Sequence, residues 1–346
     1  MNYLELSAGA DFHTHLRSNE MMKQIVPSIH HGGCSIVYVM PNLMPPITTI
    51  DMCMNYKREL EALDSNTTFL MSLYLCPEIT PVVIEQAKAV GIVGVKAYPK
   101  GVTTNSEFGI ESYEPYYPTL SAMEKHGLVL NIHGEAHYST EKEAVTVLTA
   151  EQAFLPTLHN LHARFPKLKI VLEHCTTAAA IEAVKSCGDN VVGTITAHHL
   201  FLTIDDWAGN AYAYCKPVAK LPSDRKELLN IATSGNKKFF LGSDSAPHPR
   251  AHKINTKRIA AGIFTQPYLM SYLAEAFESI GKLDKLENFA CIFGREFYNV
   301  KNVGMDKKII LKKQPFQVPS EFGSGDTSVV PFLEGSILNW TVTWKQ

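Results

Sequence analysis

The residues that decide the fold, 11–17, read DFHTHLR and follow an apolar run near the N-terminus. Side chains on a strand alternate between its two faces, so His13 and His15 point the same way and can reach one metal ion. Imidazole nitrogen suits zinc, although other divalent metals accept it too. Two histidines hydrogen-bonded to neighbouring groups at a strand end would give the same local pattern. Other parts of the sequence must therefore decide between a metal site and a pair of hydrogen-bonded histidines.

Four later segments repeat this arrangement of an apolar run followed by polar residues. They are GVKAYP at 94–99, NIHGE at 131–135, LEHC at 172–175 and GSDSAPH at 242–248. Strands are expected to end near His15, Asn42, Leu75, Pro99, Glu135, Thr176, His199 and His248, with amphipathic stretches typical of helices between most of them. This alternation predicts an α/β fold, either a (β/α)₈ TIM-type barrel or a doubly wound sheet. The barrel is preferred because the polar residues lie at the carboxyl ends of most strands, where barrel active sites form.

Composition narrows the class of protein. The chain has 346 residues, 45% of them hydrophobic and 19% charged, with a formal net charge of −2. That balance argues against disorder and against a nucleic-acid partner, and leaves a small molecule as the expected one. The seven cysteines form no close-spaced pair, and no apolar run of about 18 residues occurs, so a soluble cytoplasmic protein without a membrane partner is expected. We expect one domain, a barrel over about residues 8–300 and a C-terminal extension of short strands over about 301–346.

The ordered set of motifs resembles the amidohydrolase superfamily and, within it, dihydroorotases of the single-function, shorter type. The motifs lie between about residues 10 and 267, and their combination is much more specific than any one alone. They are HTHLR at 13–17, MPN at 40–42, VKAYP at 95–99, TTN at 103–105, HGE at 133–135, EH at 173–174, TAHH at 196–199 and GSDSAPH at 242–248.

The resemblance implies a metal centre with two Zn²⁺ ions per chain. His13, His15 and Asp244 would hold one zinc, and His133 and His174 the other. Lys96 would bridge the two ions as a carboxylated lysine, together with a hydroxide. An ordinary ammonium at this position would be repelled by two dications, which is why the family uses the carboxylated amine. A lysine whose head reaches solvent at a barrel rim is the alternative for Lys96.

The implied reaction is the reversible hydrolysis of the cyclic amide of (S)-dihydroorotate to N-carbamoyl-L-aspartate, whose reverse closes the ring in pyrimidine biosynthesis. Asp244 would be the catalytic residue that accepts and returns the proton. Arg17 lies two residues beyond His15, and its planar guanidinium can bind a carboxylate through two hydrogen bonds. The resemblance implies these substrate-binding residues: Arg17, Asn42, Thr103, Thr104, Lys216, His248, Ala261 and Gly262. At Lys216 the backbone is expected to act, which leaves that side chain free to vary.

Three hypotheses stay open from the sequence. The first is dihydroorotase; the second is a hydrolase of another cyclic amide, such as a hydantoin or a dihydropyrimidine; the third is an inactive relative kept as a scaffold. Strand alternation turns Glu173 away from His174, so Glu173 is expected to pack or form a salt bridge. His198 and His199, placed at the end of the seventh strand, are expected to support the site without binding metal. The oligomeric state is open, with a homodimer as one alternative.

Overall fold

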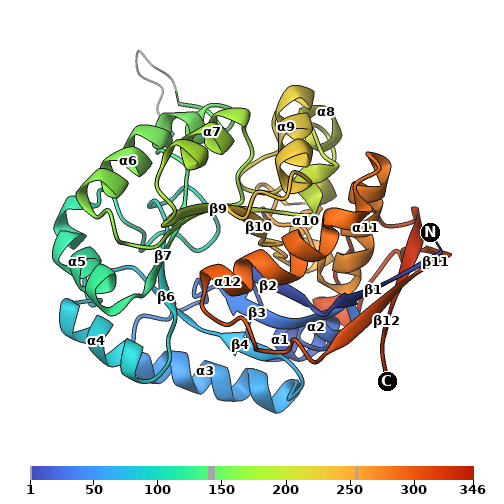
Figure 1. Cartoon of the computed structure of the whole chain (residues 1–346), viewed down its shortest axis with the longest axis horizontal. Helices are drawn as coiled ribbons and strands as arrows, with labels where there is room; N and C mark the ends of the chain where they lie inside the picture. The colour runs from blue at the N-terminus through green and yellow to red at the C-terminus, as the bar shows by residue number, and fades with distance from the viewer. Residues whose placement is uncertain (1, 139–144, 255) are drawn as a thin grey trace.

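The computed structural model describes residues 2–138, 145–254 and 256–346. Within these residues eight parallel strand positions form a closed barrel, seen in Figure 1 as the strands inside the ring of helices. They are β2 (Gly9–Thr14), β3 (Cys34–Val39), β4 with β5 (Thr68–Leu70 and Ser72–Tyr74), β6 (Gly94–Ala97), β7 (Val129–His133), β8 (Ile170–Glu173), β9 (Val191–Ile195) and β10 (Phe239–Leu241). A parallel bridge between Thr14 and Ser245 joins the first position to the last. The TIM-type barrel prediction is therefore confirmed.

Helices follow most of the strands and cover the outside of the barrel (Figure 1). The longer ones are α3 (Ile50–Leu63), α4 (Pro81–Ala89), α5 (Tyr117–His126), α6 (Ala150–Arg164), α7 (Ala178–Ser186), α9 (Pro222–Ala232) and α11 (Leu269–Ser279). Shorter ones are α1 (Asn19–Ile25), α2 (Pro27–His31), α8 (Ile204–Trp207), α10 (Arg250–Lys253) and α12 (Phe293–Phe297). In α3 the Thr49 side chain caps the first turn, and Cys53, Tyr56 and Leu60 form the buried stripe. Their spacing of three and four residues is that of one helix face.

The N-terminus and the C-terminal extension form a separate antiparallel sheet at one side of the barrel. Its order is β1 (Tyr3–Ser7), β11 (Lys308–Gln317) and β12 (Ile337–Trp344). Trp340 of β12 is fully buried, and its indole nitrogen donates to Glu278 Oε2 of α11 at 2.9 Å. The strands expected in the extension are present, but they are longer than expected, and the addition of β1 to their sheet was not predicted.

Two strand ends differ from the sequence expectation. The last barrel strand, β10, ends at Leu241, so His248 lies in a loop well beyond it. After β9, which ends at Ile195, His198 and His199 lie in a 3₁₀ turn (His198–Leu200), not on the strand. In both cases the expected strand included polar residues that lie beyond the true strand end. Strand boundaries are the feature that a sequence pattern predicts least accurately. None of the helices in the described residues combines the length and the apolar character needed to span a membrane.

Candidate metal centre

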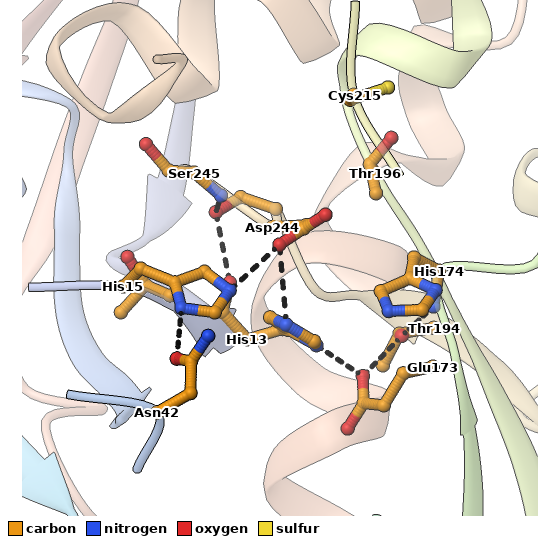
Figure 2. A network of polar contacts seen from close by, with 12 residues as sticks. His13, His15, Asn42, Glu173, His174, Thr194, Thr196, Cys215, Asp244 and Ser245 are labelled. Atoms are coloured by element: carbon orange, nitrogen blue, oxygen red, sulfur yellow. Dashed lines mark hydrogen bonds and ion pairs between the residues drawn. The ribbon is translucent and has the colours of Figure 1, made fainter. Parts of the chain in front are cut away.

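His13, His15 and Asp244 come together at the carboxyl ends of β2 and β10. Asp244 Oδ1 lies 3.0 Å from His15 Nε2 and 3.3 Å from His13 Nε2, and all three side chains are buried (Figure 2). One ligand atom from each lies within 4.8 Å of those of the other two, which makes the group a candidate metal site. His13 and His15 therefore point the same way, as the alternation of side chains along a strand predicted.

Backbone geometry turns the side chains of His174 and Asp244 into the barrel mouth. His174 has φ of +43° and Asp244 has φ of +46°, so each occupies the left-handed region directly after its strand or strand extension. Such conformations cost about 1–3 kcal/mol each and occur where the surrounding structure imposes them. Asp244 is held there partly by its amide, which donates to the His13 carbonyl at 2.9 Å. The strained backbone is thus found at His174 and Asp244, two residues whose side chains can bind a metal.

A second group of ligand-type residues lies beside the first. The rings of His133 and His174 are 4.7 Å apart between centroids, and those of His13 and His174 are 5.1 Å apart. Lys96 on β6 is fully buried, and its Nζ has no hydrogen-bond partner among the described residues. Burial lowers the pKa of Lys96 from 10.5 to about 8, so the neutral amine, although still the minor form at neutral pH, is far more abundant than in an ordinary lysine.

Hydrogen bonds outside this cluster fix the orientation of three of the four imidazoles. His13 Nδ1 contacts Glu173 Oε2 at 2.8 Å, His15 Nδ1 contacts Asn42 Oδ1 at 2.7 Å, and His133 Nε2 contacts Glu135 Oε2 at 2.8 Å. In each ring this leaves the opposite nitrogen free of these partners. Carboxylate and amide partners of this kind orient metal-binding histidines and raise their basicity.

Glu173 does not behave as strand alternation predicted. It forms the expected salt bridge, but with His13, so Glu173 and its neighbour His174 both face the centre (Figure 2). The alternation argument fails because the chain leaves the extended conformation at His174. Glu173 Oε2 also accepts from the Thr194 hydroxyl at 2.6 Å, and Oε1 accepts from the Asn131 amide at 2.6 Å. Glu135, which the sequence motif contained but to which no role was given, supports His133 in the same manner.

The donor set fits a divalent metal. The buried Nζ of Lys96 and Nδ1 of His174 lack partners in the described residues, which buried polar atoms rarely do unless a ligand is missing. Burial lowers the pKa of His15 to about 4 and that of His174 well below 6.5, so both rings are neutral and able to coordinate. Burial would raise the pKa of Asp244, but its contacts with His13 and His15 overcome this effect and hold the carboxyl ionised.

Most of the predicted substrate-binding residues line the same pocket as the candidate ligands. That pocket is lined by His13, His15, Arg17, Asn42, Tyr98, Thr103, Thr104, His133, His174, Lys216, Asp244, Ala246, Ala261 and Gly262. Lys96 does not line this pocket, but its charge acts on the pKa values of His133 and His174, which do. His248 lines the adjoining pocket, which Arg17, Asn42 and Thr104 share. Tyr98 and Ala246 are lining residues that the sequence reading did not single out.

Arg17, which lines both pockets, contacts His248 of the adjoining one. Arg17 Nε donates to the Pro247 carbonyl at 2.8 Å, and its Nη2 lies 3.2 Å from His248 Nε2. The same His248 nitrogen lies 3.0 Å from the Ala261 carbonyl. Burial lowers the pKa of Arg17 to about 10, which still leaves the guanidinium charged at neutral pH. The pocket therefore offers a fixed cation to an anionic ligand.

The loop after β6 is tied down over the pocket. The Asn42 amide donates to the Thr104 carbonyl at 3.1 Å, and the Thr104 hydroxyl lies 3.4 Å from the Ala261 carbonyl. Lys216 Nζ donates to the Val102 carbonyl at 2.6 Å. The Lys216 side chain, which the resemblance left free to vary, thus has a specific partner in the loop. Asn42 likewise has two protein partners, His15 and the loop.

His199 is a supporting residue of a neighbouring turn. Its Nδ1 lies 2.8 Å from the Thr196 hydroxyl, and its Nε2 lies 3.1 Å from the Pro217 carbonyl, with Cys215 Sγ 3.7 Å from Nε2. Both ring nitrogens are therefore engaged, although His198, His199 and Cys215 are close enough together to hold an ion. Neither nitrogen of the buried His198 has a partner within the described ranges.

Comparison with known proteins identifies the family. An amidohydrolase family model matches residues 61–258. The chain is 57% identical to a probable dihydroorotase of Schizosaccharomyces pombe, and the match covers 99% of both chains. It is 46% identical to the dihydroorotase of Saccharomyces cerevisiae, over 99% of this chain and 98% of the relative. The crystal structure of the Saccharomyces cerevisiae dihydroorotase in complex with 5-fluoroorotic acid superposes with a TM-score of 0.96, at 45% identity, over 100% of this chain and 99% of that one. With the barrel and the strand-end site already described, these matches show that the chain is a hydrolase of the amidohydrolase superfamily and belongs to its dihydroorotase family.

Proposed function

We propose that this enzyme is a dihydroorotase that hydrolyses the cyclic amide of (S)-dihydroorotate to N-carbamoyl-L-aspartate and runs the reverse reaction in pyrimidine biosynthesis. The observation that carries the proposal is the convergence of His13, His15 and Asp244 in one pocket that also contains Arg17. The first three are ligand types for a hydrolytic metal. Arg17 supplies a cation that can bind a carboxylate-bearing substrate. The buried Lys96, unpartnered among the described residues, is close enough to two other lining residues, His133 and His174, for its charge to act on their pKa values.

Two zinc ions are proposed as the cofactor. His13, His15 and Asp244 would hold one, His133 and His174 the other, and Lys96 would join them as its carboxylated form. When bound, such a pair of ions makes water a nucleophile near neutral pH and polarises the carbonyl under attack. The lowered pKa of Lys96 supports carboxylation, because the neutral amine is the form that reacts with carbon dioxide.

The chain's own residues would bind the substrate and move the proton. The Arg17 guanidinium would bind the substrate carboxylate, with His248 and Asn42 beside it. Asp244 is ionised and lies at the pocket surface, so it can accept the proton of the attacking water. Once protonated, it can donate that proton to the leaving ring nitrogen. Thr103 and Thr104, together with the backbone at Lys216, Ala261 and Gly262, would bind the rest of the ring and exclude bulk water.

Arg17→Ala is expected to weaken substrate binding. The lost charged hydrogen bonds are worth about 1.5–3 kcal/mol, or roughly a 10-fold to 150-fold rise in KM. Metal content should stay unchanged, because Arg17 touches no candidate ligand in the described contacts. Steady-state kinetics with metal analysis measures both. Arg225→Ala, which removes an exposed arginine that also donates to a carbonyl, is the control and should leave KM unaltered. An unchanged KM for Arg17→Ala would remove Arg17 from the substrate site.

Glu173→Gln is expected to lower metal affinity by about 10-fold to 100-fold, the usual effect of losing a carboxylate behind a metal-binding histidine. The amide keeps the shape but loses the charge that orients His13. Titration of the metal-free protein with zinc measures the change. Glu182→Gln, at an exposed glutamate paired with Lys185, is the control. Wild-type zinc affinity in Glu173→Gln would show that His13 needs no such partner.

The proposed function is tested by the loss of ultraviolet absorbance of L-dihydroorotate on adding zinc-loaded protein, with hydantoin and dihydrouracil run in parallel. Turnover of dihydroorotate alone is the expected result. Activity only on another ring would refute the proposal in favour of a different cyclic-amide hydrolase. Inactivity on all three, with two zinc ions bound, would refute it in favour of a scaffold.

A further inference from the structure

Lys253, the last residue of α10, is buried with 4% of its surface exposed and has three backbone partners. Its Nζ donates to the carbonyls of Tyr214 at 2.9 Å, Ala260 at 2.9 Å and Gly262 at 2.7 Å. An ammonium has three N–H donors and no acceptor. The three carbonyls therefore satisfy this group completely.

These carbonyls belong to two segments that are distant in sequence but form one wall of the pocket. Tyr214 precedes Lys216, and Ala260 and Gly262 flank Ala261; Lys216, Ala261 and Gly262 all line the pocket. The Gly262 amide also donates to the Tyr214 carbonyl at 3.1 Å. Lys253 thus joins both segments without itself lining the pocket.

The two segments have little freedom to adjust if the Lys253 hydrogen bonds that join them are lost. A Cβ atom on Gly262 would lie 2.2 Å from the Ala246 carbonyl oxygen, so the backbone approaches its neighbour as closely as a glycine allows. The Ala261 carbonyl, between two carbonyls held by Lys253, is the acceptor that lies against His248. A shift of the 260–262 segment would therefore move both the backbone wall and the His248 ring.

Lys253 has no carboxylate partner in the described part of the chain, where its contacts are carbonyls alone. Burying a cation without a counterion costs several kcal/mol, and an apolar side chain of the same size would avoid that cost. Stability alone therefore does not account for a lysine here. A positive charge bonded to the backbone of the pocket wall would, however, attract a carboxylate-bearing ligand.

We propose that Lys253 is a positioning residue for substrate binding, which holds the Tyr214–Lys216 and Ala260–Gly262 segments in register and adds positive charge next to them. The inference rests on the proposed dihydroorotase function. Lys253 acts through the backbone that it holds and does not reach the substrate.

The test is the kinetics of Lys253→Met with Lys220→Met as the matched control. Lys220 is also 4% exposed and donates to one carbonyl, that of Val218, but it lies outside the pocket. Lys253→Met is expected to raise KM for dihydroorotate at least about fivefold with a smaller change in kcat, because binding is lost and the metal-centred chemistry is kept. Zinc content should match the wild type. Lys220→Met should change the thermal unfolding midpoint but not KM.

Lys253→Arg serves as a second variant in case the methionine protein does not fold. Arginine keeps the charge, but its planar fork cannot direct three donors at three converging carbonyls. Its KM is also expected to rise at least about fivefold. A smaller rise in KM for the folded variants would overturn the inference and leave Lys253 a structural residue. If the wild-type protein itself does not turn over dihydroorotate, the proposed function fails instead, so the two failures are distinguishable.

Discussion

Lys96→Ala is expected to lose at least one of the two proposed zinc ions and to lower kcat by about 10³-fold or more. The reason is that a metal-centred site contributes several kcal/mol of transition-state stabilisation, and each 1.36 kcal/mol is a factor of ten in rate. Lys96 Nζ is fully buried and has no hydrogen-bond partner among the described residues, so the substitution breaks no hydrogen bond there. Zinc analysis of the purified variant and steady-state kinetics measure the two effects.

Lys100→Ala is the matched control for this experiment. Lys100 lies four residues further along the same segment, is exposed, and pairs with Glu111, so its removal should change neither zinc content nor kcat. Addition of short carboxylic acids should restore part of the activity of Lys96→Ala, because their carboxylates can occupy the space of the carboxylated lysine. A Lys96→Ala protein with the full zinc content would refute the carboxylated-lysine proposal.

The barrel was predictable from the sequence because its evidence is local. Short apolar runs, amphipathic stretches and polar strand ends repeat along the chain, and each depends on neighbouring residues only. The pairing of His13 with His15 was predictable for the same reason, since β2 stays extended through Thr14. The argument failed at Glu173 and His174, where the left-handed conformation of His174 brings both side chains to the centre. Periodicity cannot foresee a backbone turn that tertiary contacts impose.

The supporting residues of the site could not be predicted because their partners are distant in sequence. Glu173 meets His13 across 160 positions, and Asn42 meets His15 across 27. Lys253 has no sequence signal at all, because its three partners are backbone carbonyls, which every residue carries. The family resemblance supplied the candidate ligands and substrate contacts, whereas the three-dimensional structure supplied the groups that hold them in place. The N-terminal strand β1 was missed for the same reason, since it pairs with β11 some 300 residues later.

Asp244→Asn is expected to lower kcat by about 10²-fold to 10⁴-fold while changing KM much less. General acid–base groups contribute rate factors of this size, and an amide can neither accept the proton of water nor donate a proton to the leaving nitrogen. Burial alone would raise the pKa of Asp244, but contacts with His13 and His15 hold it well below 3.8, so the wild-type carboxylate is ionised at every assay pH near neutrality. Raising the pH should therefore not restore the variant, and a flat, low pH–rate profile is expected.

Asp11→Asn provides the comparison that separates proton transfer from structure. Asp11 is also a fully buried aspartate at this end of the barrel, where it accepts hydrogen bonds from the Ser243 amide at 2.8 Å and the Ser243 hydroxyl at 2.6 Å, but it does not line the pocket. The same substitution there should lower the unfolding midpoint and affect kcat far less. Zinc content must be measured for both variants, because Asp244 is also a candidate ligand. An Asp244→Asn enzyme that keeps both metals and near wild-type kcat would show that another group carries the proton, and Asp244 would then remain only as a ligand.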